Sequence, residues 1–194
     1  MRETLERDGA VLAADLLSKP HIEALRALAN DAIGARPGAR LRGDVALDSI
    51  LASNGPVGAL AARLTSSAAR PVRAVMFDKT PEANWIVAWH QDRVIPVRER
   101  REVEGFGPWS TKDGVLHVAL GSHRLGRVPA EAATREAEAL RQLVCLADTA
   151  DVWAYSTPIL HASDRAEPPR RRRVLQVDYA DFDLPGGLEW LGVG

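Results

Sequence analysis

The sequence contains a single cysteine, Cys145, among 194 residues. One thiol excludes an intramolecular disulfide framework and is typical of a protein from a reducing compartment. Apolar runs of about 18 residues, the length of a membrane-spanning helix, are lacking. The first twenty residues carry charges where a secretory signal has an apolar core. We therefore expect a cytoplasmic protein with no membrane partner.

The chain also lacks an excess of charge of either sign. Twenty-six acidic and 25 basic side chains leave a formal net charge of -1. This balance argues against nucleic acid as the main partner, and the basic run at 170–173 follows two prolines, as in a solvated loop that enters a strand. We expect a small-molecule partner, and the choice between monomer and homodimer stays open.

The length favours a single domain, residues 1–194. The sequence pattern changes once along the chain, from helical to β. Residues 1–70 are rich in Ala and Leu, and helical spacing predicts one helix between Ser18 and Gly34 and a second from Pro56. Residues 71–194 form the β part, with a charged helical insertion at 129–143. Its predicted strands are 72–77, 84–89, 114–120, 143–147, 151–156 and 172–179. This order predicts an α+β domain with a mainly β core, a β-sandwich or jelly roll.

The stretch WHQD at 89–92 places two metal-binding residue types at the end of a predicted strand. Side chains at i and i+2 of a strand share a face, so His90 and Asp92 converge while Gln91 points away. An imidazole and a carboxylate are two thirds of the 2-His-1-carboxylate set that suits non-haem Fe(II) and O2 chemistry. The pair therefore predicts a metal site that needs one more histidine.

The third ligand has to come from elsewhere in the chain. His161 closes an apolar stretch, 157–163, where a second strand can run beside the first, and we favour it. His123 lies in a polar turn, where we expect local hydrogen bonds. The histidines that remain are His21, in the first turn of the predicted helix, and His117.

The last predicted strand alternates between a polar and an apolar face. Arg172, Val174, Gln176 and Asp178 share one face, and Arg173, Leu175, Val177 and Tyr179 share the other. The planar guanidinium of Arg172 can hold a carboxylate through paired charge-assisted bonds. A metal together with this arginine describes a site for a 2-oxo acid.

These motifs occur in a characteristic order. A His-x-Asp is followed by Trp-Ser at 109–110, Gly-Ser-His-Arg at 121–124, and a distal histidine with a serine two residues on and an arginine eleven residues on. The order resembles the phytanoyl-CoA dioxygenase family of Fe(II)/2-oxoglutarate oxygenases. The resemblance is strongest over 72–123 and 151–179.

The resemblance implies a double-stranded β-helix, a cupin-like jelly roll, with N-terminal helices. It implies that His90, Asp92 and His161 bind Fe(II) as the catalytic centre and that Arg172 pairs with the distal carboxylate of 2-oxoglutarate. It further implies a cosubstrate pocket completed by Ser163, Trp109 and Gln91. The implied activity is hydroxylation of a small organic substrate, with conversion of 2-oxoglutarate and O2 to succinate and CO2.

One departure from the family is large. The family has a further core strand and a connection between the GVLHV segment and the GSHR turn, whereas residues 114–124 join the two directly. We therefore expect core strands to be missing near Val118–Ala119, which leaves ladder groups unpaired. This predicts an alternative, a catalytically impaired member that acts as a ligand-binding or structural domain. A cupin-like metalloenzyme that uses Zn(II) or Mn(II) is a third reading.

The sequence leaves the roles of two further basic residues open. Lys79 and Arg42 can each reach a substrate or cosubstrate carboxylate or remain solvated. Cys145, in the apolar segment LVCLA, is expected to be a buried small hydrophobe.

Overall fold

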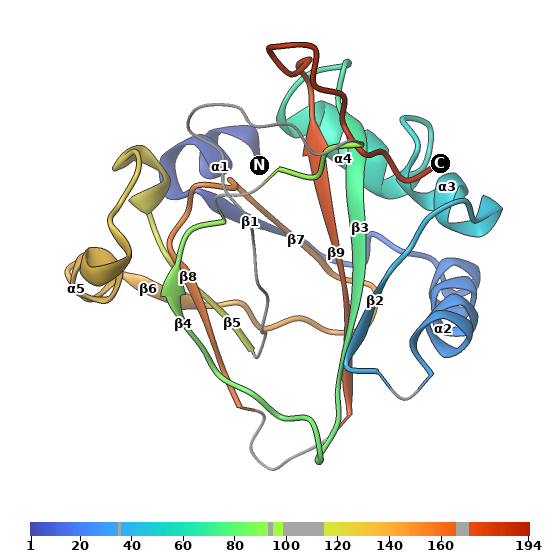
Figure 1. The fold of residues 1–194 in the computed structure, drawn as a ribbon, viewed down its shortest axis with the longest axis horizontal. Coiled ribbons are helices and arrows are strands. Elements are labelled where there is room, and N and C mark those ends of the chain that lie inside the picture. The colour runs from blue at the N-terminus through green and yellow to red at the C-terminus, as the bar shows by residue number, and fades with distance from the viewer. Residues whose placement is uncertain (35, 93–94, 99–114, 166–170) are drawn as a thin grey trace. The chain divides into compact units, whose positions relative to one another are not determined.

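The computed structural model describes residues 1–34, 36–92, 95–98, 115–165 and 171–194. They divide into two compact units, each built from separate stretches of the chain (Figure 1). Of the described residues, the first unit comprises 1–14, 79–92, 115–165 and 171, and the second comprises 15–34, 36–78, 95–98 and 172–194.

The first unit is built on a four-stranded sheet. Its order is β4 (Val87–His90), β8 (His161–Asp164), β5 (Val115–Ala119) and β6 (Gln142–Val144), with every pairing antiparallel. A second sheet pairs β1 (Ala10–Ala13) with β7 (Val152–Tyr155), also antiparallel. The predicted strand beside β4 is thus confirmed, because His161 opens β8 directly opposite His90.

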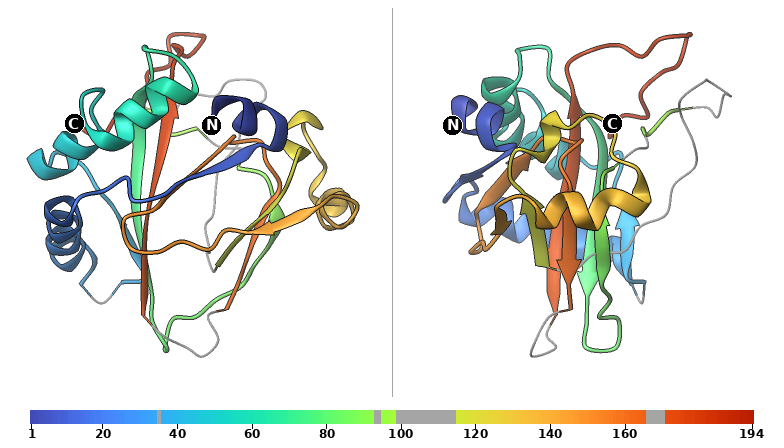
Figure 2. Two further views of the ribbon diagram at one scale, coloured as in Figure 1. Left: turned by 180° about the vertical axis from the view of Figure 1, so that it is seen from behind. Right: turned by 90° about the vertical axis from the view of Figure 1, so that its left-hand side faces the viewer.

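Apolar clusters pack on both faces of the four-stranded sheet. On one face, Ala119 and Leu160 pack with residues of η2 (Ala130–Ala132) and α5 (Ala133–Glu138), and α5 lies across the sheet in Figure 2. On the other face, Val118 and Cys145 pack against β1 and β7. Cys145 is buried, as predicted. The sheet is therefore the middle layer of the first unit, and its second face carries the metal-binding side chains described below.

The remaining elements of the first unit are α1 (Arg2–Asp8) and the 3-10 turn η1 (Ser122–Arg124). Gly9 ends α1 in the left-handed region, at φ 82°. A Cβ atom there would lie 2.4 Å from Nδ1 of His123, so only glycine fits. The ring of His123 bonds to the carbonyl of Glu6 through Nε2, at 3.1 Å. The expectation of local bonds was wrong, since His123 ties the GSHR turn to the first helix.

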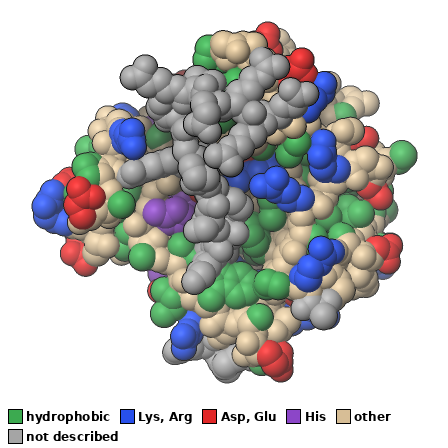
Figure 3. Space-filling view, viewed as in Figure 1, with side chains coloured by type: hydrophobic (Ala, Val, Ile, Leu, Met, Phe, Trp, Pro, Cys, Tyr) green, Lys and Arg blue, Asp and Glu red, His purple; other side chains and the backbone are tan. Residues whose placement is uncertain are grey.

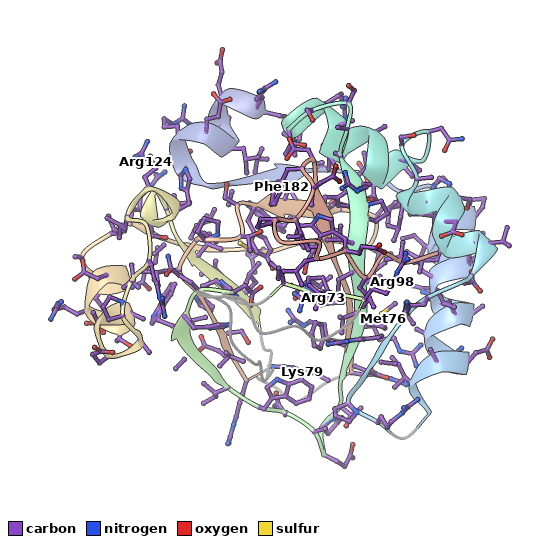
Figure 4. All side chains as sticks on the ribbon, turned by 45° about the horizontal axis from the view of Figure 1, so that its top comes forward. Arg73, Met76, Lys79, Arg98, Arg124 and Phe182 are labelled. Atoms are coloured by element: carbon purple, nitrogen blue, oxygen red, sulfur yellow. The ribbon has the colours of Figure 1, made fainter. Side chains whose placement is uncertain are left out.

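The second unit packs helices against a three-stranded sheet. The sheet order is β2 (Gly38–Arg40), β3 (Arg70–Lys79) and β9 (Arg172–Ala180), and the helices are α2 (Lys19–Ile33), α3 (Val45–Leu51) and α4 (Pro56–Leu64). Met76 of β3 and Leu175 and Val177 of β9 join the helix-covered core. Arg73, marked with Met76 in Figure 4, lies on the opposite face of β3 and forms an ion pair with Asp178. The predicted alternation along residues 172–179 is confirmed.

Both predicted helices are present. At the start of α2 the backbone N–H of Ser18 donates to Nδ1 of His21 at 3.2 Å, which gives this histidine a capping role. α4 begins at Pro56, as Pro is tolerated in the first turn. The short elements α1, β1, β2 and α3 were not predicted, because each has seven residues or fewer and little room for a periodic pattern.

One stretch of described residues, Val45–Leu64, has the length and mean hydropathy, 1.2, of a membrane span, contrary to the expectation from the sequence. It is not one continuous helix: α3 ends at Leu51, and α4 begins only at Pro56. Leu47, Ile50 and Leu51 belong to the core of the second unit. The stretch is therefore weak evidence for a membrane segment.

The sheets differ in detail from the predicted arrangement. Strands occur within residues 1–70 as well as after them, so the predicted helical N-terminal part also contributes to the sheets. β5 ends at Ala119, and the turn η1 begins three residues later, at Ser122. Within the described residues, β7 has β1 as its one neighbour and β9 has β3. A complete double-stranded β-helix and the loss of core strands both stay predictions.

Candidate metal centre

The β4–β8 ladder brings two histidines face to face. His90 is the last residue of β4 and His161 the first of β8, and the antiparallel register pairs them directly. Directly opposite residues point to the same face of a sheet. The two ring centroids are 4.2 Å apart, with the ring planes inclined at 50°.

Asp92 follows β4 and completes the cluster. Its Oδ1 lies 4.0 Å from Nε2 of His90 and 4.0 Å from Nε2 of His161. Both distances exceed those of a hydrogen bond. One ligand atom from each residue lies within 4.8 Å of the other two. The predicted convergence of these three side chains is confirmed.

Backbone carbonyls set the tautomer of each imidazole. Nδ1 of His90 lies 2.9 Å from the carbonyl oxygen of Ala88, and Nδ1 of His161 lies 3.1 Å from that of Ile159. A carbonyl oxygen only accepts, so we assign the ring proton to Nδ1 in both residues. In the neutral imidazole each Nε2 then carries a lone pair, and it lies 4.0 Å from Oδ1 of Asp92. This is the arrangement in which a hydrogen bond at one ring nitrogen orients the other for metal binding.

Burial is uneven across the cluster. His161 is 5% exposed, and the side chains of Asp92 and His90 are 11% and 37% exposed. Burial lowers the pKa of His161, with a further lowering from His90, against opposing contributions from Asp92 and the carbonyl of Ile159. A lowered pKa keeps this imidazole neutral, the state that binds a metal. The cluster opens to solvent on the side of His90, and Figure 3 shows histidine at the surface over β4 and β8.

A buried hydroxyl lies on the same face as the cluster. Ser163 is two residues after His161 on β8 and is 3% exposed. Its Oγ has no hydrogen-bond partner among the described residues. An orphaned hydroxyl destabilises the fold unless a ligand or water satisfies it. This position fits the predicted contact with a bound cosubstrate.

Gln91 lies between His90 and Asp92 but is occupied by the backbone. Its Nε2 donates to the carbonyls of Gly126 at 2.9 Å and Pro158 at 2.6 Å, and its Oε1 accepts from the N–H of Val128 at 2.9 Å. These bonds leave no amide hydrogen for a ligand. A role for Gln91 in cosubstrate binding stays a prediction that its contacts do not favour.

The other predicted ligand-binding residues fall elsewhere. Arg172 is half-buried at the start of β9 in the second unit, on the polar face predicted for it. Trp109 lies outside the described residues. Their roles in cosubstrate binding stay predictions.

Two buried polar residues near the cluster were not identified from the sequence. Lys79, marked in Figure 4, is buried rather than solvated, and its Nζ donates to the carbonyls of Trp85 and Asp164 at 2.6 and 3.1 Å. Oγ of Ser122 donates to the carbonyl of Ala119 at 2.6 Å and accepts from the N–H of Leu160 at 2.8 Å. Both residues fasten the strand that carries His161. The GSHR motif was a signal for Ser122, but its second partner, Leu160, lies 38 residues further along the chain.

The donors fit a divalent first-row metal ion. Two neutral imidazole nitrogens and one carboxylate oxygen are the 2-His-1-carboxylate set of non-haem Fe(II) oxygenases, and Zn(II) accepts the same donors. Such a site needs ligands held in fixed positions. The strand pairing holds His90 opposite His161, and the carbonyls of Ala88 and Ile159 orient the two rings. The cluster is therefore a candidate metal centre.

Solved structures of low sequence identity resemble the whole chain. The non-heme alpha-ketoglutarate-dependent carbocyclase SnoK from nogalamycin biosynthesis matches with a TM-score of 0.71 and 16% identity over 99% of this chain and 86% of that one. The epimerase SnoN, solved with Fe3+, alpha-ketoglutarate and nogalamycin RO, gives 0.69 and 16% over 96% and 89%. EctD from S. alaskensis in its apoform gives 0.63 and 18% over 99% and 79%.

The chain shares the fold of these enzymes. Neither a scan against protein-family models nor a search of curated protein sequences gives a match. At these identities the likeness establishes the fold alone, and function has to be argued from the site. The chain therefore combines this fold with a His-Asp-His cluster that could hold a metal ion.

Proposed function

We propose that the protein is an Fe(II)- and 2-oxoglutarate-dependent dioxygenase of the phytanoyl-CoA dioxygenase family that hydroxylates a small organic substrate in the cytoplasm. The observation that carries the proposal is the convergence of His90, Asp92 and His161, whose ligand atoms lie within 4.8 Å of one another. The similar fold of SnoN, solved with iron and alpha-ketoglutarate, supports it. The reaction converts 2-oxoglutarate and O2 to succinate and CO2 as the substrate is hydroxylated.

Bound iron would supply the activation of O2 and of the 2-oxo acid. His90, Asp92 and His161 would hold it through two imidazole nitrogens and one carboxylate oxygen, the donor set that suits non-haem Fe(II) and O2 chemistry. The carboxylate of Asp92 offsets part of the cation's charge, and the neutral imidazoles add none. The greater exposure of His90 makes its side of the cluster the natural entrance for a small substrate.

Two further residues have proposed roles with 2-oxoglutarate. The buried hydroxyl of Ser163 would donate to a cosubstrate carboxylate, which would satisfy an atom that lacks a partner among the described residues. Arg172 would pair with the distal carboxylate through two parallel N–H···O bonds. Arg172→Ala should therefore strongly raise the concentration of 2-oxoglutarate that the enzyme needs for half-maximal activity. A cupin-like enzyme supported by Zn(II) or Mn(II) would tolerate that change.

The proposal is tested by anaerobic addition of Fe(II) and 2-oxoglutarate to the purified protein. We expect a weak visible charge-transfer band and a binding isotherm for 2-oxoglutarate by calorimetry, both absent in His161→Ala. If the unchanged protein gives neither signal, the assignment as a 2-oxoglutarate oxygenase fails.

A second candidate function is a ligand-binding or structural domain that has lost catalysis. The observation in its favour is that, among the described residues, β7 and β9 each have a single neighbouring strand. A strand with one neighbour makes backbone hydrogen bonds along one edge only and is less stable than a central strand. Succinate formation above that of the His161→Ala protein, with Fe(II), 2-oxoglutarate and O2 present, would exclude this candidate.

A further inference from the structure

We propose that Gln91 is a positioning residue, whose carboxamide fixes the two chain segments that carry the metal-binding side chains. The inference rests on the candidate metal centre of the proposed function, and it assigns Gln91 a role other than cosubstrate binding. It does not depend on which reaction the bound metal supports.

The carboxamide of Gln91 is fully used inside the first unit. The residue is 6% exposed, and its three hydrogen bonds, at 2.6, 2.9 and 2.9 Å, all go to backbone groups. The partners, Gly126, Val128 and Pro158, lie 35, 37 and 67 residues further along the chain. Such a buried, fully satisfied polar network fixes one arrangement of the segments that it joins.

Those segments carry all three candidate ligands. Gln91 is the residue between His90 and Asp92, so its anchoring holds both of them at the end of β4. Pro158 lies three residues before His161, and the next residue, Ile159, supplies the carbonyl that orients the His161 ring. One side chain therefore joins the two halves of the cluster from the opposite face of the strand.

The chemistry of the side chain is specific to this task. Two of the partners are carbonyl acceptors and one is an N–H donor, and a primary amide matches all three. A glutamate keeps the acceptor for Val128 but has no hydrogen for Gly126 or Pro158. A methionine has similar length and neither function. Gln91→Glu therefore removes part of the network, and Gln91→Met removes all of it.

Residues that orient metal ligands without contacting the metal typically strengthen metal binding about 10- to 100-fold. We expect the dissociation constant for Fe(II), measured anaerobically by equilibrium dialysis, to rise by about that factor in Gln91→Glu and by at least as much in Gln91→Met. Tyr179→Phe is the matched control, since it removes one hydrogen bond, to the carbonyl of Leu51 at 2.8 Å, from the second unit. Its affinity for Fe(II) should equal that of the unchanged protein.

A measurement on the unchanged protein avoids any failure of the variants to fold. Coupling between two sites is reciprocal, so metal bound at the cluster must stabilise the Gln91 network by the same factor. We expect Zn(II), used as a diamagnetic probe, to slow hydrogen exchange at the N–H of Val128 by about 10-fold or more. The N–H of Ala139, the C-cap residue of α5, is bonded to the carbonyl of Arg135 and serves as the reference for general stabilisation.

The outcomes separate this inference from the proposed function. The positioning role is overturned if the unchanged protein binds metal and the Gln91 variants bind it with equal affinity. It is also overturned if metal slows hydrogen exchange equally at Val128 and Ala139. Either result leaves the metal centre standing. An unchanged protein that binds neither Fe(II) nor Zn(II) overturns both.

Discussion

Ser122→Ala is the substitution for which the structure gives the clearest energetic expectation. The side chain of Ser122 is fully buried. Its Oγ donates to the carbonyl of Ala119 at the end of β5 and accepts from the N–H of Leu160, the residue before His161. Alanine removes both bonds and alters the packing by one atom only. The N–H of Leu160 then remains buried without its partner.

The expected loss follows from these two bonds. A net hydrogen bond contributes about 0.5–1.5 kcal/mol, and a buried donor left unsatisfied costs about 1–3 kcal/mol. We therefore expect the free energy of unfolding to fall by about 2–4 kcal/mol, a large part of the ~5–15 kcal/mol typical of a domain. With a urea dependence of about 2 kcal/mol per molar, the middle of the usual range, the midpoint should fall by roughly 1–2 M.

Urea unfolding of the metal-free protein, followed by circular dichroism, measures this difference. Ser49→Ala is the matched control, because Ser49 is exposed and its Oγ makes one bond to the carbonyl of Ala46 within α3. Exposed changes of this kind usually stay within about 0.5 kcal/mol. If Ser122→Ala costs no more than Ser49→Ala, the two bonds do not fasten β5 to the His161 segment and the reasoning is refuted.

Three further predictions concern residues away from the cluster. Ala150 has φ 95°, which is strained for any residue with a Cβ, so Ala150→Gly should raise the free energy of unfolding by about 1 kcal/mol in urea; a lower midpoint would contradict this. Gly9→Ala should lower the thermal midpoint, because its Cβ would lie 2.4 Å from Nδ1 of His123. The loss caused by Gly9→Ala should be smaller in a His123→Ala background, where the contact with Nδ1 is absent, and equal losses in the two backgrounds would count against it. Burial raises the pKa of the Cys145 thiol to about 12, so at pH 8 a thiol reagent should label the folded protein at least ~100-fold more slowly than the urea-unfolded protein. Equal rates would show that the thiol is accessible and ionised.

The sequence predicted the cluster well because its signals are local or follow simple periodicity. His90 and Asp92 are two residues apart on one strand, and the alternation along 172–179 is confirmed by the packing of Leu175 and Val177 in the second core. His161 required more, since only the pairing of β4 with β8 brings it to His90. An apolar run before a histidine was enough to propose that pairing.

The features that sequence analysis missed depend on contacts between distant residues. Gln91 was assigned to a ligand pocket, yet its amide bonds to backbone groups 35 to 67 residues away, which no local pattern encodes. The sequence left Lys79 open between a carboxylate contact and a solvated position, whereas two backbone carbonyls accept hydrogen bonds from its buried ammonium. Polar side chains can be buried wherever the fold supplies partners, and those partners are visible only in three dimensions.

The central claim is that His90, Asp92 and His161 form one metal centre. Anaerobic equilibrium dialysis against Fe(II), followed by metal analysis, tests it most directly when the unchanged protein is compared with three single alanine variants of these residues. We expect one iron per chain in the unchanged protein and little or none in each variant. Iron-free unchanged protein, or variants that retain a full iron, would contradict it.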